Sequence, residues 1–116
     1  MNIESFREYC LSKKGATEDF PFDESILVLK IGGKMFALTD LYSEFQINLK
    51  CDPEKAEELR EIYSSVIPGW HMSKKHWNTV IIDGSISDKL ILSWIDDSYD
   101  LVMKSLPKKV QSELGF

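Results

Sequence analysis

Residues 26–50 read ILVLKIGGKMFALTDLYSEFQINLK, and this stretch decides the fold. Its first six residues form an apolar, partly β-branched run that is too short for a helix and therefore predicts a strand. The dipeptide Gly32-Gly33 that follows is typical of a two-residue hairpin turn. Residues 34–41 are therefore expected to return as a second, antiparallel strand.

The third strand has the clearest pattern, because apolar and polar residues alternate strictly along it. The apolar positions are Phe45, Ile47 and Leu49. The polar positions are Gln46, Asn48 and Lys50. This alternation predicts one buried face and one face that meets water or a partner, with the polar row on the second.

Helix starts flank this sheet-forming stretch on both sides. Asn2 can cap a first helix that ends near residue 14, and Asp52-Pro53 combines a capping carboxylate with a proline suited to the first helical position. That second helix is expected to reach residue 63. Ser87 opens the longest helix, to about residue 102, and Pro107 starts a short last helix through residue 114.

Two further short strands are expected at residues 70–72 and 77–82, joined by the turn at residues 73–76, whereas the acidic stretch before residue 26 is expected to be a loop. The order is helix, three strands, helix, two strands, helix and short helix. Tight turns between neighbouring strands favour an antiparallel sheet. We therefore predict one α+β domain over residues 1–116, a two-layer sandwich with a five-stranded antiparallel sheet and helices on one face.

Composition narrows the class of protein. With 43% hydrophobic and 28% charged residues the chain of 116 residues can form a core, and its net charge of −5 argues against a strongly basic protein that coats nucleic acid. Charges at Glu4, Arg7 and Glu8 interrupt any export signal, and no apolar run is long enough to span a bilayer. We expect a cytoplasmic monomer without membrane contact, with Cys10 and Cys51 reduced.

Catalytic chemistry has little support in the sequence. The motifs GxGxxG, GxxxxGK[ST], GxSxG and HExxH are absent, so we expect neither an enzyme nor a bound cofactor. The spacing of His71 and His76 matches no zinc template, and we expect no metal site. An enzyme or metal binder built from these histidines and an acidic loop is kept as a third hypothesis. The loop acids are Glu18, Asp19, Asp23 and Glu24.

Residues 69–82 hold the densest group of basic and aromatic side chains. Lys74, Lys75 and His76 stand between Trp70 and Trp77, and the segment contains no acidic residue. Ammonium groups beside flat rings could contact phosphates and stack on bases. The same pattern also fits two core tryptophans joined by a solubilising turn, and the residues alone leave both interpretations open.

Several longer motifs resemble the MmcQ/YjbR family of small bacterial proteins over nearly the whole chain. They are Leu29 to Leu38, Asn48 to Pro53, Pro68 to Met72, Lys75 to Thr79 and Ser98 to Val102. The resemblance implies a CyaY-like, secretion-chaperone-like fold with the element order given above. This chain has Trp70 and Ser73 where the family usually has tyrosine and asparagine, and the second difference removes an amide.

The resemblance also implies a DNA-binding role, in which two hairpin wings contact the duplex. The wings would be the turn at Gly32-Gly33-Lys34 and the turn at residues 73–76. The nucleic-acid-binding residues expected on this basis are Lys34, Asn48, Lys50, Trp70, His71, Lys74, Lys75, His76 and Asn78. The expected partner is duplex DNA, bound weakly and in a salt-sensitive way. The alternative is a protein- or peptide-binding module that uses the exposed face of the sheet, which suits an acidic body better.

Overall fold

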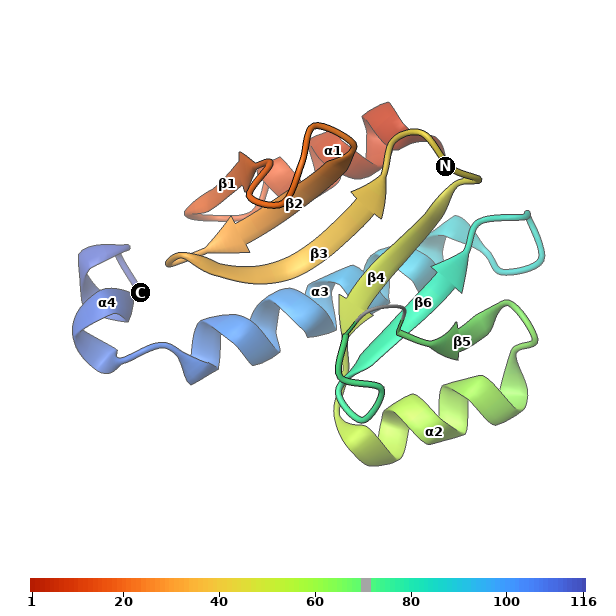
Figure 1. Cartoon of the computed structure of the whole chain (residues 1–116). Coiled ribbons are helices and arrows are strands. Elements are labelled where there is room, and N and C mark those ends of the chain that lie inside the picture. Colours follow the sequence, from red (N-terminus) through yellow and green to blue (C-terminus); the bar gives the residue numbers. More distant parts are fainter. Residues whose placement is uncertain (70–71) are drawn as a thin grey trace.

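A six-stranded antiparallel sheet forms one layer of the molecule, in the order β1-β2-β3-β4-β6-β5, and helices cover one of its sides (Figure 1). The computed structural model describes residues 1–69 and 72–116. The strands are β1 (Ala16–Asp19), β2 (Ile26–Ile31), β3 (Lys34–Asp40), β4 (Gln46–Lys50), β5 (Val66–Pro68) and β6 (Trp77–Ile81). The helices are α1 (Ile3–Leu11), α2 (Pro53–Ile62), α3 (Asp88–Ser105) and α4 (Lys108–Glu113).

The expected α+β class and the helices on one side of the sheet are confirmed, but the sheet has six strands instead of five. The extra strand is β1, in the stretch predicted as an acidic loop. Its own side chains are mostly exposed, and it forms by pairing along β2, from Ala16 opposite Ile31 to Asp19 opposite Val28. An edge strand of this kind depends on its neighbour more than on its own pattern.

The short strand expected at residues 70–72 lies instead at Val66–Pro68, as β5, where it pairs with β6. Met72 lies in a bend, and residues 70 and 71 fall outside the described residues. Pro68 is tolerated in β5 because this strand is the edge of the sheet.

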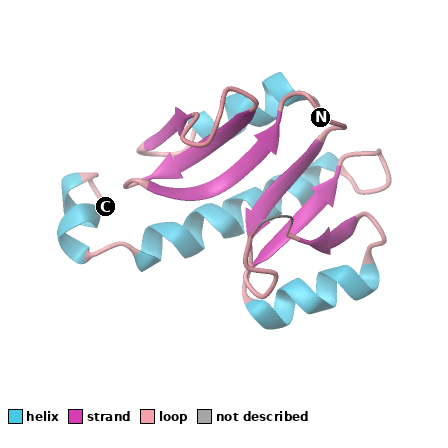
Figure 2. Ribbon diagram, in the orientation of Figure 1, coloured by secondary structure: helices cyan, strands magenta, loops and turns pink. Residues whose placement is uncertain are grey.

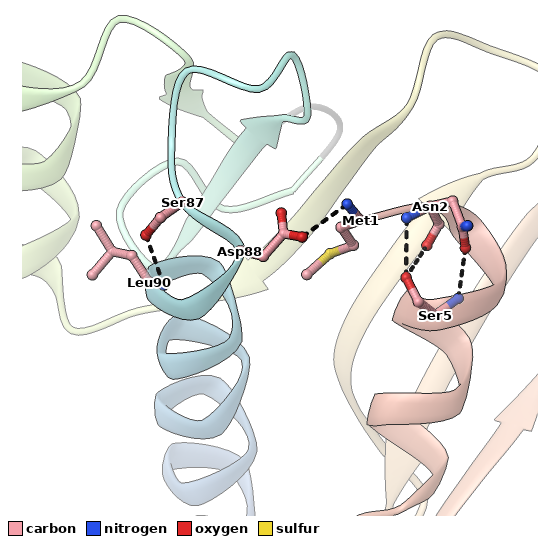
Figure 3. A network of polar contacts seen from close by, with 6 residues as sticks. All are labelled: Met1, Asn2, Ser5, Ser87, Asp88 and Leu90. Atoms are coloured by element: carbon pink, nitrogen blue, oxygen red, sulfur yellow. Dashed lines mark hydrogen bonds and ion pairs between the residues drawn. The ribbon is translucent and has the colours of Figure 1, made fainter.

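Capping side chains begin the three longer helices as expected. Asn2 accepts a hydrogen bond from the Ser5 backbone N–H, Asp52 from that of Lys55, and Ser87 from that of Leu90. Figure 3 shows α1 and α3 side by side at their first turns, where the Met1 amino group lies 3.0 Å from Asp88 Oδ2. This ion pair and the hydrogen bond from the Tyr9 hydroxyl to Asp96 Oδ1 at 2.7 Å join α1 to α3 on the same side of the sheet.

A bulge in β3 increases the number of side chains that face the helices. Leu29 pairs with Ala37 while Lys30 pairs with Met35, so Phe36 has no residue opposite it on β2. Phe36 and Ala37 both lie in the helix-side core, and Met35 lies on the opposite side of the sheet. The fully buried members of the helix-side core include Phe6, Leu29, Ile31, Phe36, Ile47, Ile91 and Ile95.

The other side of the sheet, called the open face below, carries no packed helix in the described part of the chain (Figure 1). Two loops border it, residues 20–25 between β1 and β2 and the described residues 72–76 before β6 (Figure 2). A second, smaller apolar cluster lies on this face, with Val28, Leu38 and Trp77 at its centre. The open face is thus the place where a binding surface can form without disturbing the main core.

Candidate functional site

Both expected wings lie at the same end of the sheet. Lys34 is the first residue of β3, Lys50 is the last residue of β4, and Trp77 is the first residue of β6. The central strand β4 pairs antiparallel with both β3 and β6. The pairing of Lys50 with Trp77 therefore brings the second turn to the end of the sheet where the Gly32-Gly33 turn also lies. The topology brings together the two turns that the sequence had separated by about forty residues.

The second turn is held in place by Arg60 of α2. Its Nε donates to Asn78 Oδ1 at 2.7 Å, and its terminal nitrogen donates to the backbone carbonyl of Lys74. The turn also closes on itself, because the Trp77 N–H donates to the Ser73 carbonyl at 2.9 Å. Its lysines are exposed and border a shallow depression of about 380 Å³. The depression is lined by Pro53, Glu54, Glu57, Arg60, Lys74 and Lys75.

Several residues expected to meet nucleic acid are buried. Asn78 is 3% exposed and faces α2, where its amide donates to the Ala56 carbonyl at 3.3 Å. Trp77 is 8% exposed and packs in the cluster of the open face, so it offers no free ring for base stacking. Lys34, Lys74, Lys75 and His76 are exposed and Lys50 is half-buried, while Trp70 and His71 lie outside the described residues.

Asn48 departs from the wet polar row in which it was expected. Gln46 and Lys50 are half-buried, but Asn48 is only 5% exposed. Its Oδ1 accepts a hydrogen bond from Thr79 Oγ1 at 2.5 Å, across the pairing of β4 with β6. Asn48 is therefore a buried side chain on the open face and not a surface residue of a wing.

A groove of about 560 Å³ lies on the open face. Its lining residues are Phe22, Asp23, Ser25, Ile26, Met35, Leu38, Asp40, Gln46, Asn48 and Met72. The floor belongs to β2, β3 and β4, and the two bordering loops supply Phe22 and Met72. Apolar walls with a few polar groups are typical of ligand-binding clefts, and methionine adapts its shape to different ligands.

Sequence reasoning missed the apolar part of this groove. A signal was present, since residues 26–29 are apolar on both faces of the strand, and such continuous runs are typical of strands that are covered on both sides. Met35 reaches the open face only because of the bulge at Phe36. Phe22 is 64% exposed beside the groove, and its contribution depends on a loop path that no local pattern predicts.

Three of the four acidic loop residues make ion pairs or turn hydrogen bonds. Glu18 binds Arg7 at 2.6 Å, and Asp19 binds Lys30 at 3.1 Å. Hydrogen bonds from Ser25 and from the Ile26 N–H lower the pKa of Asp23 below its usual value. Within residues 1–69 and 72–116, no group of three or more His, Cys, Asp and Glu side chains could hold a metal ion.

Both cysteines are free, as expected for reduced residues. Burial in the helix-side core raises the pKa of the Cys10 thiol to about 12. Burial also raises the pKa of Cys51, which is half-buried. A thiol whose pKa is raised by burial is a poor nucleophile, so these residues do not suggest thiol chemistry.

No helix in the described part of the chain is both long and apolar enough to span a membrane.

The family model YjbR matches residues 11–101. Among curated proteins, the uncharacterized protein YbdF of Escherichia coli O157:H7 is 43% identical over 96 residues, covering 82% of this chain and 79% of its own. The uncharacterized protein YjbR of Escherichia coli K12 is 34% identical over 110 residues, covering 94% and 93%.

Solved structures agree with this assignment. The crystal structure of Deinococcus radiodurans protein DR2400, described as a DUF419 domain, matches with a TM-score of 0.93 and 38% identity, over 99% of this chain and 88% of that chain. A Pseudomonas syringae crystal structure matches with a TM-score of 0.74 and 29% identity, over 88% of this chain and 99% of that one. The resemblance found in the sequence motifs is thus confirmed, and the chain belongs to the YjbR family.

Proposed function

We propose that this YjbR-family chain is a peptide-binding module that uses the groove on its open face. The observation that carries the proposal is an apolar groove of about 560 Å³ on the side of the sheet that carries no packed helix in the described residues. Ile26, Met35 and Met72 line this groove and are half-buried, and Phe22 beside it is 64% exposed. A contiguous apolar surface of this kind is typical of a site that another molecule covers.

The groove's dimensions and chemistry suit a short peptide segment. Its walls are formed by flexible side chains such as Met35 and Met72, and its floor offers the amides of Gln46 and Asn48. Side-chain amides can hydrogen-bond to a peptide backbone in either direction, because each has donor and acceptor atoms. Apolar contact would then supply most of the affinity, and the amides would orient the segment.

A selection from random dodecapeptides displayed on phage tests this proposal. The wild-type chain and Met35→Lys are used in parallel, because the new ammonium group would occupy the groove while its stem keeps the apolar contact. Ile62→Lys is the matched control, since Ile62 is an exposed apolar residue of α2 that does not line the groove. Folding of both variants is checked by thermal unfolding.

We expect one enriched peptide family whose synthetic members shift amide resonances of β2, β3 and β4 in a ¹⁵N-labelled chain. Met35→Lys should weaken their binding about tenfold or more, and Ile62→Lys should leave it unchanged. Equal enrichment on wild type and Met35→Lys, or resonance shifts confined to the helix side, would overturn the proposal.

Weak binding to duplex DNA is a second candidate, supported by the common location of the two turns. Lys34, Lys74 and Lys75 are exposed at that end of the sheet, and none of them makes an ion pair within the described residues. Glu54 and Glu57 lie beside the second turn and oppose its positive charge. The buried Trp77 and the net charge of −5 also make this candidate weaker than the peptide groove.

Binding to a short duplex at several salt concentrations separates the two candidates. If Lys34, Lys50, Lys74 and Lys75 each neutralise one phosphate, log affinity should fall against log salt with a slope of about −3.6. The double variant Lys74→Glu with Lys75→Glu should then lose most of the binding, whereas Lys89→Glu on α3 should change it little. Equal affinity of the double variant and the wild type would remove the DNA model.

A further inference from the structure

The groove on the open face has acidic groups on its rim, and none of the described residues that line it is basic. Asp23 and Asp40 are the charged residues among those that line it. Lys30 also belongs to the open face, but its ammonium group binds Asp19 at 3.1 Å and does not line the groove. Both charged side chains among the described lining residues are therefore negative, whereas Lys34, Lys50, Lys74 and Lys75 lie at the other end of these strands from Asp23 and Asp40.

Each rim carboxylate keeps one oxygen for a ligand. Asp23 Oδ1 accepts hydrogen bonds from the Ser25 N–H and hydroxyl and from the Ile26 N–H, and Asp40 Oδ1 accepts one from the Tyr42 N–H at 2.9 Å. The Oδ2 atoms of both residues have no partner within residues 1–69 and 72–116. These turns fix the carboxylates in place, and the second oxygen remains available to a cation.

Asn48 adds an independent sign that the groove holds a ligand. Asn48 is 5% exposed, and its Oδ1 accepts a hydrogen bond from Thr79 Oγ1. The Asn48 Nδ2 donates to no other group in the described part of the chain. Every completely shielded side-chain N or O atom there has a partner, so Nδ2 keeps some exposure, and Asn48 is one of the residues that line the groove. A nearly buried N–H without a partner is costly unless a ligand oxygen or water accepts from it.

We propose that the groove selects a segment of a partner protein in which bulky apolar residues stand next to lysine or arginine. The apolar side chains would fill the space between Ile26, Met35 and Leu38. The cation would meet the free oxygens of Asp23 and Asp40, and a backbone carbonyl of the segment would accept from Asn48 Nδ2. This inference rests on the proposed peptide-binding function and adds the charge of the ligand to it.

Three blocked hexapeptides with the same two phenylalanines and with basic, acidic or neutral residues between them test the inference, with the sequences GFKFKG, GFEFEG and GFSFSG. Each is titrated into the ¹⁵N-labelled chain at low salt and at about 0.5 M NaCl. We expect the basic peptide to bind tightest, about tenfold above the neutral one, and to lose this advantage at high salt because the attraction is screened. The shifted amides should belong to β2, β3 and β4.

Charge-neutral variants identify the carboxylates responsible. Asp40→Asn should weaken the basic peptide about threefold, and its combination with Asp23→Asn about tenfold, since asparagine keeps the Oδ1 acceptor that each turn needs. Affinity for the neutral peptide should stay the same. Glu4→Gln on α1 removes the same charge from an exposed helical position and should have no effect.

The Asn48 donor is tested by a pair of variants that lose the same internal hydrogen bond. Thr79→Val removes the bond to Asn48 but leaves the amide, whereas Asn48→Ala removes both. We expect Asn48→Ala to weaken all three peptides about fivefold more than Thr79→Val does. Equal affinities of the two variants would remove Asn48 from the site.

The outcomes separate this inference from the proposed function. Equal binding of the three peptides in the groove, or tightest binding of the acidic one, overturns the charge preference and leaves peptide binding intact. Failure of all three, while peptides selected from the displayed library bind the groove, also overturns the inference alone. If neither the hexapeptides nor the library yields groove binding, both proposals fall.

Discussion

The two faces of the sheet differ in what covers them, although both are apolar. On the helix side, Leu29, Phe36 and Ile47 are completely buried beneath α1 and α3. On the open face, Val28 and Leu38 are buried by neighbouring strand side chains and by a loop. The helix-side face stabilises the fold. The open face is also apolar, although folding does not require it to be, and such a surface is typical of a binding site.

The polar groups of the two faces differ in the same way. On the helix side Ser98 Oγ donates to the Phe36 carbonyl and accepts from the Lys50 N–H, so both of its hydrogen-bond partners belong to the protein backbone. On the open face Asn48 lines the groove, and its Oδ1 accepts from Thr79 Oγ1 while its Nδ2 donates to no group in the described residues. Complete satisfaction is typical of a structural core, and partial satisfaction beside a groove is typical of a binding site.

Truncating one leucine on each face should give the largest contrast. Leu29→Ala removes a completely buried side chain from the helix-side core and should lower the free energy of unfolding by about 3 to 5 kcal/mol. Leu38→Ala truncates a side chain that lines the groove on the open face, so a smaller loss of about 1 to 2 kcal/mol is expected. Urea unfolding followed by tryptophan fluorescence measures both. Equal losses would mean that the open face is a second structural core.

The two glycines of the β2–β3 turn differ in the same way, because one contacts the helix layer and the other does not. Gly32 has a φ of +58°, and a Cβ there would lie 2.7 Å from Leu106 Cδ1, a side chain of the helix-side core. Gly33 has a φ of +81°, but nothing lies within 4 Å of its Cβ position. Gly32→Ala should therefore cost about 2 to 3 kcal/mol, from backbone strain and from the clash, and Gly33→Ala about 1 kcal/mol from strain alone.

Melting temperatures and urea midpoints of the two glycine variants provide the measurement. The ranking is the informative result, because both variants introduce the same methyl group at positive φ. A Gly33→Ala variant that is as unstable as Gly32→Ala would show that α4 and Leu106 do not restrict this turn, and that the helix layer ends before it.

Most of the helix-side architecture could be predicted from the sequence, because its signals are local. The capping residues Asn2, Asp52 and Ser87 marked the helix starts, and the alternation around Ile47 marked β4. The spacing of apolar residues also marked the side of α3 that packs on the sheet. Each of these signals depends on residues that are close together in the sequence, so the pattern of residue types is enough to predict the local structure.

The open face was less predictable, since its features come from contacts between distant segments. The polar sequence of β1 shows no strand alternation, and pairing with β2 alone makes it a strand. Asn48 looked solvent-facing because its strand alternates, yet Trp77 and Thr79 on β6 help to bury that row. The groove needs Phe22 and Met72 from two loops, and neither loop has a pattern that predicts its path.

Asp83 lies in the loop that leads from β6 to α3 and so joins the sheet to the helix layer. We expect the smallest effect on stability from changing this residue. Its Oδ1 accepts from the Ser85 N–H and hydroxyl, and its Oδ2 accepts from the Ser65 hydroxyl at 2.8 Å. These hydrogen bonds lower the pKa of Asp83 to about 2. The unfolded chain binds the proton more tightly, so this stabilisation is present above about pH 4 and is lost between pH 4 and pH 2.

Asp83→Asn should therefore lower the melting temperature slightly at pH 7 and make it fall less steeply than that of the wild type between pH 4 and pH 2. Glu58→Gln on α2 is the matched control, because Glu58 is exposed and accepts no side-chain hydrogen bond in the described residues. Parallel pH profiles of Asp83→Asn and wild type would contradict the assignment. In that case the junction between the open sheet and the helix layer would be held by the serine hydroxyls and by packing, without help from the carboxylate charge.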